Sequence, residues 1–264
     1  MDISKFENAL GKSMGIDAKI STVNGRCEKH GNYVAYTLNG AGGVCPTCTE
    51  ERLKEEERSH AQSVKEHSES LMHDAILAKA GVPERYREKG FENWEFSTVE
   101  QQKVLNAVMS YAKNFNQARE VGRCLIMAGN NGTGKSHLAV AVVETVLNQG
   151  YSAMFISATE ALRMVLDCIG KHSKMTQSDA INILRYPDLL VLDDVGIAND
   201  SDTTTQITYE IIYGRYHDNK PTIITTNDNL DQLNQYIGVR TVDRMRENGG
   251  LNLPFVWESK RGMV

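Results

Sequence analysis

Apolar residues in the second half of the chain occur in short runs that are separated by longer stretches of mixed polarity. The runs cover residues 123–128, 151–157, 188–193, 221–227 and 253–258. Runs of this length are typical of strands buried in a sheet, and the stretches between them are long enough to form helices. Strands that alternate with helices predict an α/β domain, in which a parallel sheet carries helices on both faces.

A different pattern precedes this region. Residues 49–81 contain no proline and no internal glycine, and they are rich in strong helix formers. Glu51 and Glu55 precede basic residues at helical spacing, which favours a solvated helix. This helix could be an exposed linker or could bind a partner protein. We therefore divide the chain into an N-terminal module with its linker helix, residues 1–80, and an α/β domain, residues 81–264.

Composition and charge narrow the class of protein. The chain has 264 residues, of which 41% are hydrophobic and 24% charged, as in ordinary soluble globular proteins. Its formal net charge of −5 excludes a basic field over the whole molecule, so any contact with nucleic acid must come from a local patch. No apolar run approaches the ~18–20 residues that span a bilayer, and the N-terminus lacks the apolar core of a signal peptide. We expect a cytoplasmic protein that does not contact membranes.

Three of the five cysteines lie close to a histidine near the N-terminus. The four residues are Cys27, His30, Cys45 and Cys48. Thiols stay reduced in the cytosol, so metal binding is a better explanation than a disulfide. Two residues separate the members of each pair, and four nitrogen or sulfur ligands complete the tetrahedral shell of a structural Zn²⁺. Between the pairs, the β-prone residues 33–38 and the turn residues after them predict a short hairpin. The alternative is that Cys27 is an ordinary thiol and the last two cysteines are redox-active or incidental.

The segment "GNNGTGKS" matches the P-loop pattern in full. It follows the apolar run 123–128 and opens a helical stretch, which is the context that this motif requires. Its glycines let backbone N–H groups surround phosphate oxygens at the start of the helix. Lys135 would reach the β- and γ-phosphates of ATP or GTP, and Ser136 would bind Mg²⁺. The predicted nucleotide-binding residues are Gly129, Asn130, Asn131, Gly132, Thr133, Gly134, Lys135, Ser136 and His137.

Two other predicted strands end in polar residues. The run 188–193 ends in Asp193, which is followed by Asp194. Ligands of open α/β sheets lie beyond the carboxyl ends of the strands, so Asp193 is expected to hold Mg²⁺ through water. Asp194 could polarise the attacking water, or it could be a solvated turn residue. Asn227, the last residue of the run 221–227, could orient water or contact the γ-phosphate, or it could simply begin a turn.

The order of these motifs resembles one family. The segments "GNNGTGKSHLA", "LLVLDDVG", "TTN" and "GVRTVDRMR" follow one another as they do in AAA+ ATPases of the DnaC/DnaI/IstB group. This group includes bacterial and phage loaders of replicative helicases. Residues 80–94, "AGVPERYREKGFENW", are similar to the lead-in that the group places before its ATPase core. The resemblance covers residues 80–264 and implies an AAA+ core that hydrolyses ATP with Mg²⁺.

The resemblance also implies roles for individual residues. Asn227 would be the sensor 1 residue. Arg244 would be the arginine finger that enters the ATP site of a neighbouring subunit, and Arg240, one helical turn earlier, could share that role. Arg261 would lie in the sensor 2 region. Many AAA+ proteins have glutamate where this chain has Asp194, and a finger supplied in trans can change the rate ~10³–10⁵-fold, so we expect slow, partner-dependent hydrolysis.

For the whole protein, the resemblance implies a helicase loader. The zinc module would bind a hexameric replicative helicase, and the AAA+ core would assemble into oligomers on it and hold single-stranded DNA. The alternative within the same group is a transposition helper of the IstB kind, which would bind duplex DNA and a transposase. The N-terminal zinc module favours the loader.

Overall fold

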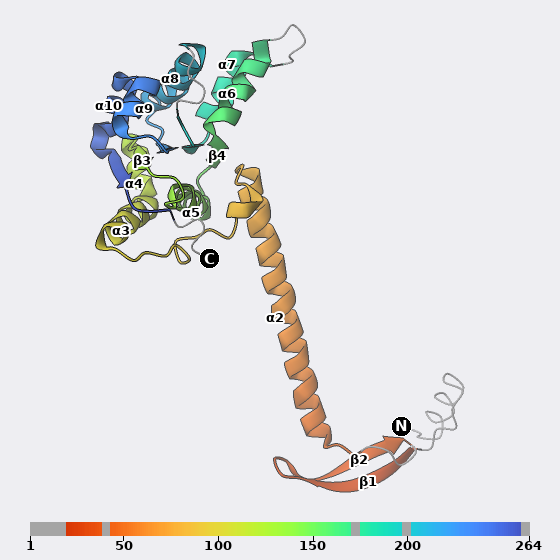
Figure 1. Ribbon diagram of the computed structural model, residues 1–264. Coiled ribbons are helices and arrows are strands. Elements are labelled where there is room, and N and C mark those ends of the chain that lie inside the picture. The colour runs from red at the N-terminus through yellow and green to blue at the C-terminus, as the bar shows by residue number, and fades with distance from the viewer. Residues whose placement is uncertain (1–19, 39–42, 170–174, 197–201, 260–264) are drawn as a thin grey trace. The chain divides into compact units, whose positions relative to one another are not determined.

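A computed structural model gives the fold of the chain and describes residues 20–38, 43–169, 175–196 and 202–259 (Figure 1). The chain divides into two compact units, Met1–Met72 and His73–Val264. The division falls inside one long helix, α2 (Pro46–Lys79). No helix in the described ranges is both long enough and apolar enough to cross a membrane.

The first unit contains an antiparallel hairpin. Strand β1 (Ile20–Cys27) pairs with β2 (Gly31–Leu38), and Cys27 lies opposite Gly31. Gly31 has φ of +74°, a conformation that glycine adopts without strain. The sequence predicted the second strand correctly but placed the hairpin between the two ligand pairs. In the structure the first pair forms the hairpin turn, because the partner strand precedes Cys27.

Helix α2 confirms the prediction of a long solvated helix. It contains 34 residues and begins with Pro46, whose fixed φ suits the first position of a helix. Exposed ion pairs such as Lys54–Glu50, at 2.6 Å, link successive turns near its N-terminus. Pairs of this kind contribute only a few tenths of a kcal/mol each. The last turns differ, because Leu77 is only 1% exposed and belongs to the core of the second unit.

The second unit is built on a five-stranded parallel sheet with the order β4-β5-β6-β3-β7. Each strand coincides with a predicted apolar run to within a few residues. The strands are β3 (Leu125–Gly129), β4 (Ala153–Ser157), β5 (Leu189–Asp193), β6 (Thr222–Thr226) and β7 (Leu251–Phe255). The predicted α/β fold with a parallel sheet is therefore confirmed.

Helices cover both faces of this sheet (Figure 1). Capping boxes begin α3, α6, α7 and α9, which explains where these helices start. The α-helices are α3 (Val99–Lys113), α4 (Phe115–Val121), α5 (Lys135–Asn148), α6 (Ala158–Leu166), α7 (Gln177–Arg185), α8 (Asp202–His217), α9 (Leu230–Ile237) and α10 (Val239–Arg246). The described ranges also contain the short 3₁₀ helices η1 (Glu84–Tyr86), η2 (Asp167–Ile169) and η4 (Glu247–Gly249).

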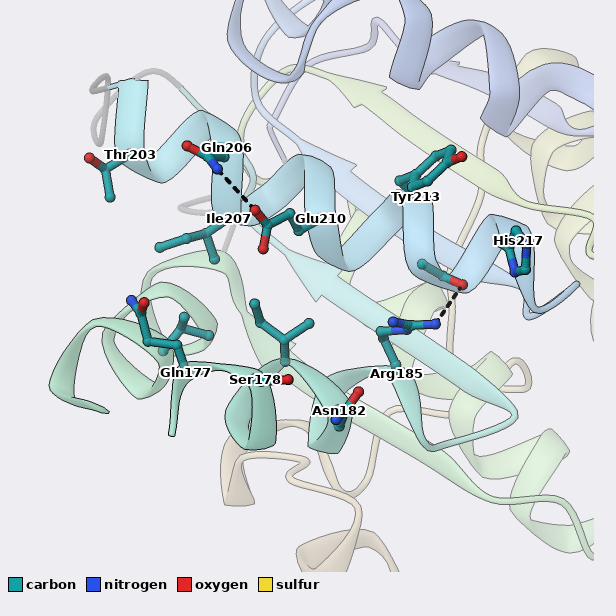
Figure 2. Close-up of a pocket in the computed structure, with 13 residues that line it drawn as sticks. Gln177, Ser178, Asn182, Arg185, Thr203, Gln206, Ile207, Glu210, Tyr213 and His217 are labelled. Carbon is teal, nitrogen blue, oxygen red and sulfur yellow. Dashed lines mark hydrogen bonds between the residues drawn. The ribbon is translucent and has the colours of Figure 1, made fainter. Parts of the chain in front are cut away.

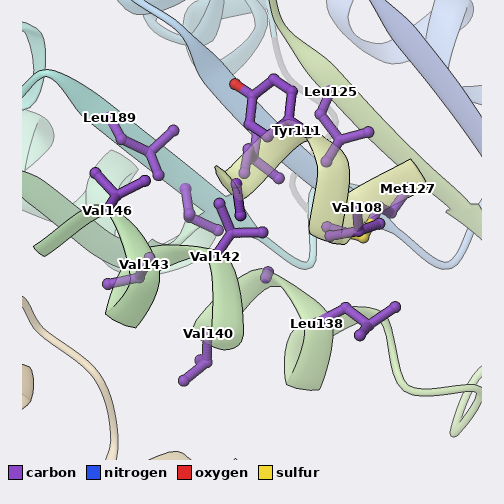
Figure 3. Close-up of a cluster of buried hydrophobic side chains, with 14 of the residues drawn as sticks. Val108, Tyr111, Leu125, Met127, Leu138, Val140, Val142, Val143, Val146 and Leu189 are labelled. Carbon is purple, nitrogen blue, oxygen red and sulfur yellow. The ribbon is translucent and has the colours of Figure 1, made fainter. Parts of the chain in front are cut away.

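Successive residues of the strands contribute to two separate hydrophobic cores. Leu125 and Met127 of β3 pack with α3 and α5 in the first core, part of which is drawn in Figure 3. Ile126, between them, packs with α6 to α10 in the second core. Side chains along a strand alternate between its two faces, so a sheet covered on both sides needs apolar residues at every position. This requirement explains the continuous apolar runs in the sequence.

The chain that follows α2 lies along the edge strand β4. The backbone N–H of Phe155 donates a hydrogen bond to the carbonyl oxygen of Ala80, at 2.7 Å. Gly81 has φ of +82°, and a Cβ atom there would lie 2.4 Å from the carbonyl oxygen of Phe155. Glycine is therefore required for this close approach. His73 of α2 also contacts Glu144 of α5, with 2.9 Å between Nε2 and Oε1.

A fully buried arginine lies at the end of the sheet where β5 and β6 begin. The guanidinium of Arg215, on α8, donates hydrogen bonds to Thr222 Oγ1 and to a group of carbonyl oxygens at the starts of β5 and β6. Burial lowers the pKa of Arg215 to about 10, so the side chain is still charged at neutral pH. The carbonyl acceptors are those of Leu184, Arg185, Pro187, Asp188 and Pro221.

Candidate functional site

The P-loop connects the end of β3 to the start of α5, as the sequence predicted. Gly129, Gly132 and Gly134 have φ of +133°, +71° and +97°. These values strain any residue with a side chain. A Cβ on Gly129 would lie 2.4 Å from the carbonyl oxygen of Phe255, and a Cβ on Gly134 would lie 2.4 Å from Trp94 Nε1. The loop is therefore confined on both sides, with the N-terminus of α5 at its end.

Lys135 places its positive charge directly over this loop. The side chain is only 6% exposed, and Nζ donates to the carbonyl oxygens of Gly129, at 2.8 Å, and Asn130, at 2.6 Å. The hydroxyl of Thr133 also donates to the carbonyl oxygen of Asn130, at 2.7 Å. A cation and the N-terminus of a helix at one loop form a site suited to phosphate oxygens.

The predicted Mg²⁺ ligands contact each other between the first turn of α5 and the end of β5. Ser136 donates a hydrogen bond from Oγ to Asp193 Oδ1, at 2.8 Å. Thr225 Oγ1 donates to the same oxygen, at 2.6 Å. Burial raises the pKa of the Asp193 carboxyl, and the hydroxyls of Thr225 and Ser136 oppose part of this rise. A hydroxyl beside a desolvated carboxylate is a donor set that suits Mg²⁺.

Asp194 and Asn227 are also brought together. Asn227 Nδ2 donates to Asp194 Oδ1, at 2.5 Å. Asp194 has φ of +59°, which is unusual for a residue other than glycine and is often found at functional sites. Its backbone N–H donates to Thr225 Oγ1, at 2.9 Å. Thr225 therefore contacts both aspartates.

Sequence reasoning did not identify Thr225 as a site residue. It is only 1% exposed and lies on β6, two positions before Asn227. The available signal was the pair of hydroxyl residues in "PTIITTN", because a strand buried on both faces normally has apolar residues there.

The nucleotide site opens into a cleft of about 850 Å³. The P-loop, both aspartates, Thr225 and Asn227 line it, and residues 85–95 of the lead-in segment contribute Arg85, Tyr86, Lys89, Asn93, Trp94 and Glu95. The family resemblance identified this segment only as the lead-in to the ATPase core. Its role as a wall of the cleft depends on tertiary contacts that no local pattern encodes.

His137 and two tryptophans attach neighbouring segments to the P-loop. His137 Nε2 lies 2.8 Å from the carbonyl oxygen of Gly90, in the lead-in segment. Trp257, after β7, donates from Nε1 to the carbonyl oxygen of Thr133, at 3.1 Å. The rings of Trp94 and Trp257 meet edge to face, with 6.3 Å between their centroids. Both ends of the second unit thus support the loop.

Arg240 and Arg244 are not among the described residues that line the cleft. Arg244, on α10, lies against the tyrosines of α8, with Cζ 4.4 Å from the centre of the Tyr213 ring. Arg240 borders a separate groove between α8 and α10. Arg261 lies outside the described residues. The structure therefore does not bring Arg244 into the ATP site of its own subunit.

The four predicted zinc ligands come together in the first unit. Their ligand atoms all lie within 4.8 Å of one another. His30 Nδ1 is 3.2 Å from Cys48 Sγ, and Cys27 Sγ is 3.5 Å from the same sulfur. Contact with Cys27 raises the pKa of the Cys48 thiol to about 11. Three thiols and an imidazole around one point are a donor set that fits tetrahedral Zn²⁺.

Glu51 completes this cluster from outside. Its Oε1 lies 3.2 Å from His30 Nε2, the ring nitrogen that faces away from the sulfurs. Its Oε2 accepts a hydrogen bond from Lys29 Nζ, at 2.6 Å. Metal-bound histidines usually donate their second N–H to a carboxylate in this way, which fixes the tautomer. The sequence analysis assigned Glu51 only to the solvated face of the helix.

A further hollow lies between α7 and α8, with a volume of about 570 Å³ (Figure 2). At one end Arg185 donates a hydrogen bond from Nη2 to the carbonyl oxygen of Gly214, at 3.4 Å, and toward the other Gln206 donates to Glu210, at 3.0 Å. Arg185 also forms an ion pair with Asp218, at 2.8 Å. None of the predicted site residues lines this hollow.

Comparisons with known proteins agree with this arrangement. The profile of the IstB-like ATP binding protein family matches residues 59–244. "Replicative helicase loader DnaC" of Buchnera aphidicola subsp. Schizaphis graminum is 28% identical over 211 residues, which cover 80% of this chain and 85% of the relative. The protein of the same name from Escherichia coli strain K12 is 26% identical over 80% of this chain and 84% of its own.

Solved structures show the same fold. The crystal structure of the DnaC helicase loader aligns with a TM-score of 0.58 and 26% identity, covering 65% of this chain and 99% of that chain. DnaI aligns with a TM-score of 0.55 at 19% identity, over 65% of this chain and 93% of its own, and this likeness concerns the fold alone. Because the family profile covers more than half of the sequence, this chain belongs to the IstB-like ATP binding protein family, whose members are AAA+ ATPases.

Proposed function

We propose that this protein is an ATP-dependent loader that places a hexameric replicative helicase on single-stranded DNA. The observation that carries the proposal is an AAA+ core of the DnaC type joined to a separate Cys/His module by α2. Relatives that carry the name of replicative helicase loader extend over most of the chain, which supports the same function.

In this proposal the P-loop cleft binds ATP with Mg²⁺. Lys135 contacts the β- and γ-phosphates, and Ser136 and Asp193 hold the metal ion, which neutralises charge on the transferred phosphoryl group. Asp194 accepts a hydrogen bond from the attacking water, and Asn227 keeps that carboxylate in position through their 2.5 Å hydrogen bond. Arg244 from a neighbouring subunit completes the site. Hydrolysis is therefore slow until subunits assemble on the helicase.

The N-terminal region acts as the adaptor for the helicase. We place this function in residues 1–80, where Cys27, His30, Cys45 and Cys48 hold a structural Zn²⁺. The ion closes the hairpin turn onto the first turn of α2, so the adaptor has a defined surface without a large hydrophobic core. The last turns of α2 pack into the ATPase core, so this helix connects the adaptor to the ATPase domain.

A second candidate function is a transposition helper that binds duplex DNA and a transposase. The IstB-like family profile favours it, because that profile covers most of the ATPase core and most of α2 but does not include the Cys/His cluster. The N-terminal module thus distinguishes the two functions.

A pull-down with the host's hexameric replicative helicase tests the proposal. The full chain is compared with Cys45→Ala and with the matched control Cys168→Ala, each in ATP and in ADP. The wild type and the control should retain the helicase, and the cluster variant should lose it. If none of the three proteins bound the helicase in any nucleotide state, the proposed loader function would be refuted. ATP-dependent assembly on duplex DNA with a transposase would then support the second candidate function.

A further inference from the structure

Three tyrosines of α8 surround the guanidinium of Arg244. Tyr209, Tyr213 and Tyr216 are spaced four and three residues apart, so they share one face of the helix. The rings of Tyr209 and Tyr213 are stacked, with centroids 5.4 Å apart and planes 8° from parallel. We call these three residues the tyrosine ladder.

Arg244 contacts each member of the tyrosine ladder differently. Its Cζ lies 4.4 Å from the centre of the Tyr213 ring and 5.4 Å from that of Tyr216. Nη1 donates a hydrogen bond to the hydroxyl of Tyr209, at 3.3 Å. The guanidinium is thus held mainly by its flat face.

The helix that carries Arg244 is firmly anchored. Val242 and Met245 of α10 are 1% and 2% exposed and belong to the second core. The neighbouring surface is open, because Val239 is 58% exposed and Tyr213 is 38% exposed. The backbone of α10 is therefore fixed, whereas the long side chain of Arg244 depends on the tyrosine ladder for its direction.

The chemistry of this contact preserves the charge of Arg244. Among the described residues, no carboxylate lies within ion-pair distance of its guanidinium. Glu247, at the end of α10, instead accepts a hydrogen bond from Tyr216, at 2.5 Å. Aromatic rings attract a cation through their faces without neutralising it, and they leave the N–H donors at its edge available. An arginine held in this way can still bind phosphate oxygens with two parallel hydrogen bonds.

We propose that Tyr213, supported by Tyr209, is a positioning residue that holds Arg244 ready to enter the ATP site of the neighbouring subunit. This inference rests on the proposed function, in which Arg244 acts in trans. A flexible arginine must lose rotamer freedom when it engages the γ-phosphate, and the tyrosine ladder removes part of that freedom before assembly. Tyr213 is not among the residues that line the P-loop cleft, so its effect reaches the reaction only through Arg244.

Mixed assemblies of full-length chains on the helicase and single-stranded DNA test this role. Arg244→Ala subunits keep their own ATP site but donate no finger, whereas Lys135→Ala subunits donate a finger but lack a working P-loop. Neither should hydrolyse ATP at the stimulated rate alone, and mixing should restore activity where the second kind serves the first. Asp193→Asn subunits, whose P-loop is intact, are used in parallel as a second finger donor.

Tyr213→Leu is then added to one subunit type at a time. On the finger donor it should lower the restored kcat about 2- to 30-fold, the range expected for one cation–π contact. On the Arg244→Ala subunit it should change nothing, whereas a merely structural effect would appear on both sides. Tyr213→Phe on the donor should restore the rate, because the ring remains. The control Tyr186→Leu removes an exposed ring that contacts a different cation, Lys220, at 5.6 Å, and should have no effect.

The possible failures are distinguishable. If both parental mixtures restore nothing, Arg244 is not a trans finger, and both this inference and that part of the proposed function are wrong. If the mixtures restore activity but donor-side Tyr213→Leu leaves the rate unchanged or raises it, only the inference is overturned. A raised rate would mean that the tyrosine ladder withholds the finger instead of presenting it.

Discussion

Thr225 offers a sharp test of how Asp193 and Asp194, the carboxylates that we propose act in catalysis, are held. Its hydroxyl donates to Asp193 Oδ1, at 2.6 Å, and accepts from the backbone N–H of Asp194, at 2.9 Å. Thr225→Val keeps the shape of the buried side chain and removes both hydrogen bonds. A hydrogen bond to a charged group contributes ~1.5–3 kcal/mol, which corresponds to roughly 10- to 150-fold in a rate or dissociation constant.

We expect this loss to appear in the Mg²⁺ dependence of ATP hydrolysis. The hydroxyl of Thr225 lowers the pKa of Asp193 against the effect of burial, so its removal raises that pKa further. Mg²⁺ binds the carboxylate and not the protonated acid, so the defect should be larger at the lower of two pH values. The measurement is a Mg²⁺ titration of the ATPase rate, with helicase and DNA present, at both pH values.

A neighbouring threonine provides the control. Thr226 is equally buried, but its hydroxyl only accepts a hydrogen bond from the N–H of Asp228, at 3.0 Å. Thr226→Val should therefore leave the Mg²⁺ dependence unchanged, and binding of a fluorescent ATP analogue without Mg²⁺ should be the same in both variants. The reasoning is refuted if Thr225→Val titrates with Mg²⁺ as the wild type does, or if both variants shift equally.

Three further predictions follow from described contacts. Asp193→Asn should remove Mg²⁺-dependent hydrolysis but raise the Tm of the nucleotide-free protein, because burial disfavours the charged carboxylate. The gain in Tm should shrink as falling pH protonates the wild-type acid. A lower Tm of the variant at neutral pH would contradict this. Glu51→Gln should weaken zinc binding about 10- to 100-fold in a competition with a chromophoric chelator, whereas Glu55→Gln should not. Arg215→Met should lower the free energy of unfolding, measured in urea, by ~3–5 kcal/mol, because buried carbonyl oxygens lose their hydrogen-bond donor. The control Arg119→Met removes a half-exposed ion pair and should lower it by less than ~1 kcal/mol.

The sequence predicted those features that local patterns encode. Each strand of the parallel sheet is a continuous apolar run in the sequence. The glycines of the P-loop motif identified the loop, and these glycines have positive φ in the structure. Ligands of open α/β sheets lie beyond the carboxyl ends of the strands, which predicted that Asp193, Asp194 and Asn227 lie close together. In the structure all three line the same cleft. Strand β1 was missed because polar residues at both faces of an exposed hairpin leave no alternation to detect.

Features that depend on tertiary contacts could not be predicted. Thr225 gains its importance only when β5 and β6 lie side by side. The lead-in segment becomes a wall of the cleft only because His137 and the two tryptophans hold it there. A charged arginine is expected to be exposed, so the full burial of Arg215 could not be predicted. The buried carbonyl oxygens that accept its hydrogen bonds explain it. The roles of Arg244 and Arg261 come from the family resemblance and stay predictions.

The attachment of α2 to β4 gives the ATPase domain a mechanical input. Any tension or twist carried by the last turns of α2 reaches the sheet at Leu77 and at the hydrogen bond between Ala80 and Phe155. Strand β4 is joined along its length to β5, with Ser157 in register with Asp193. The route from the last turns of α2 to Asp193, the carboxylate that we propose holds Mg²⁺, therefore crosses one strand pair.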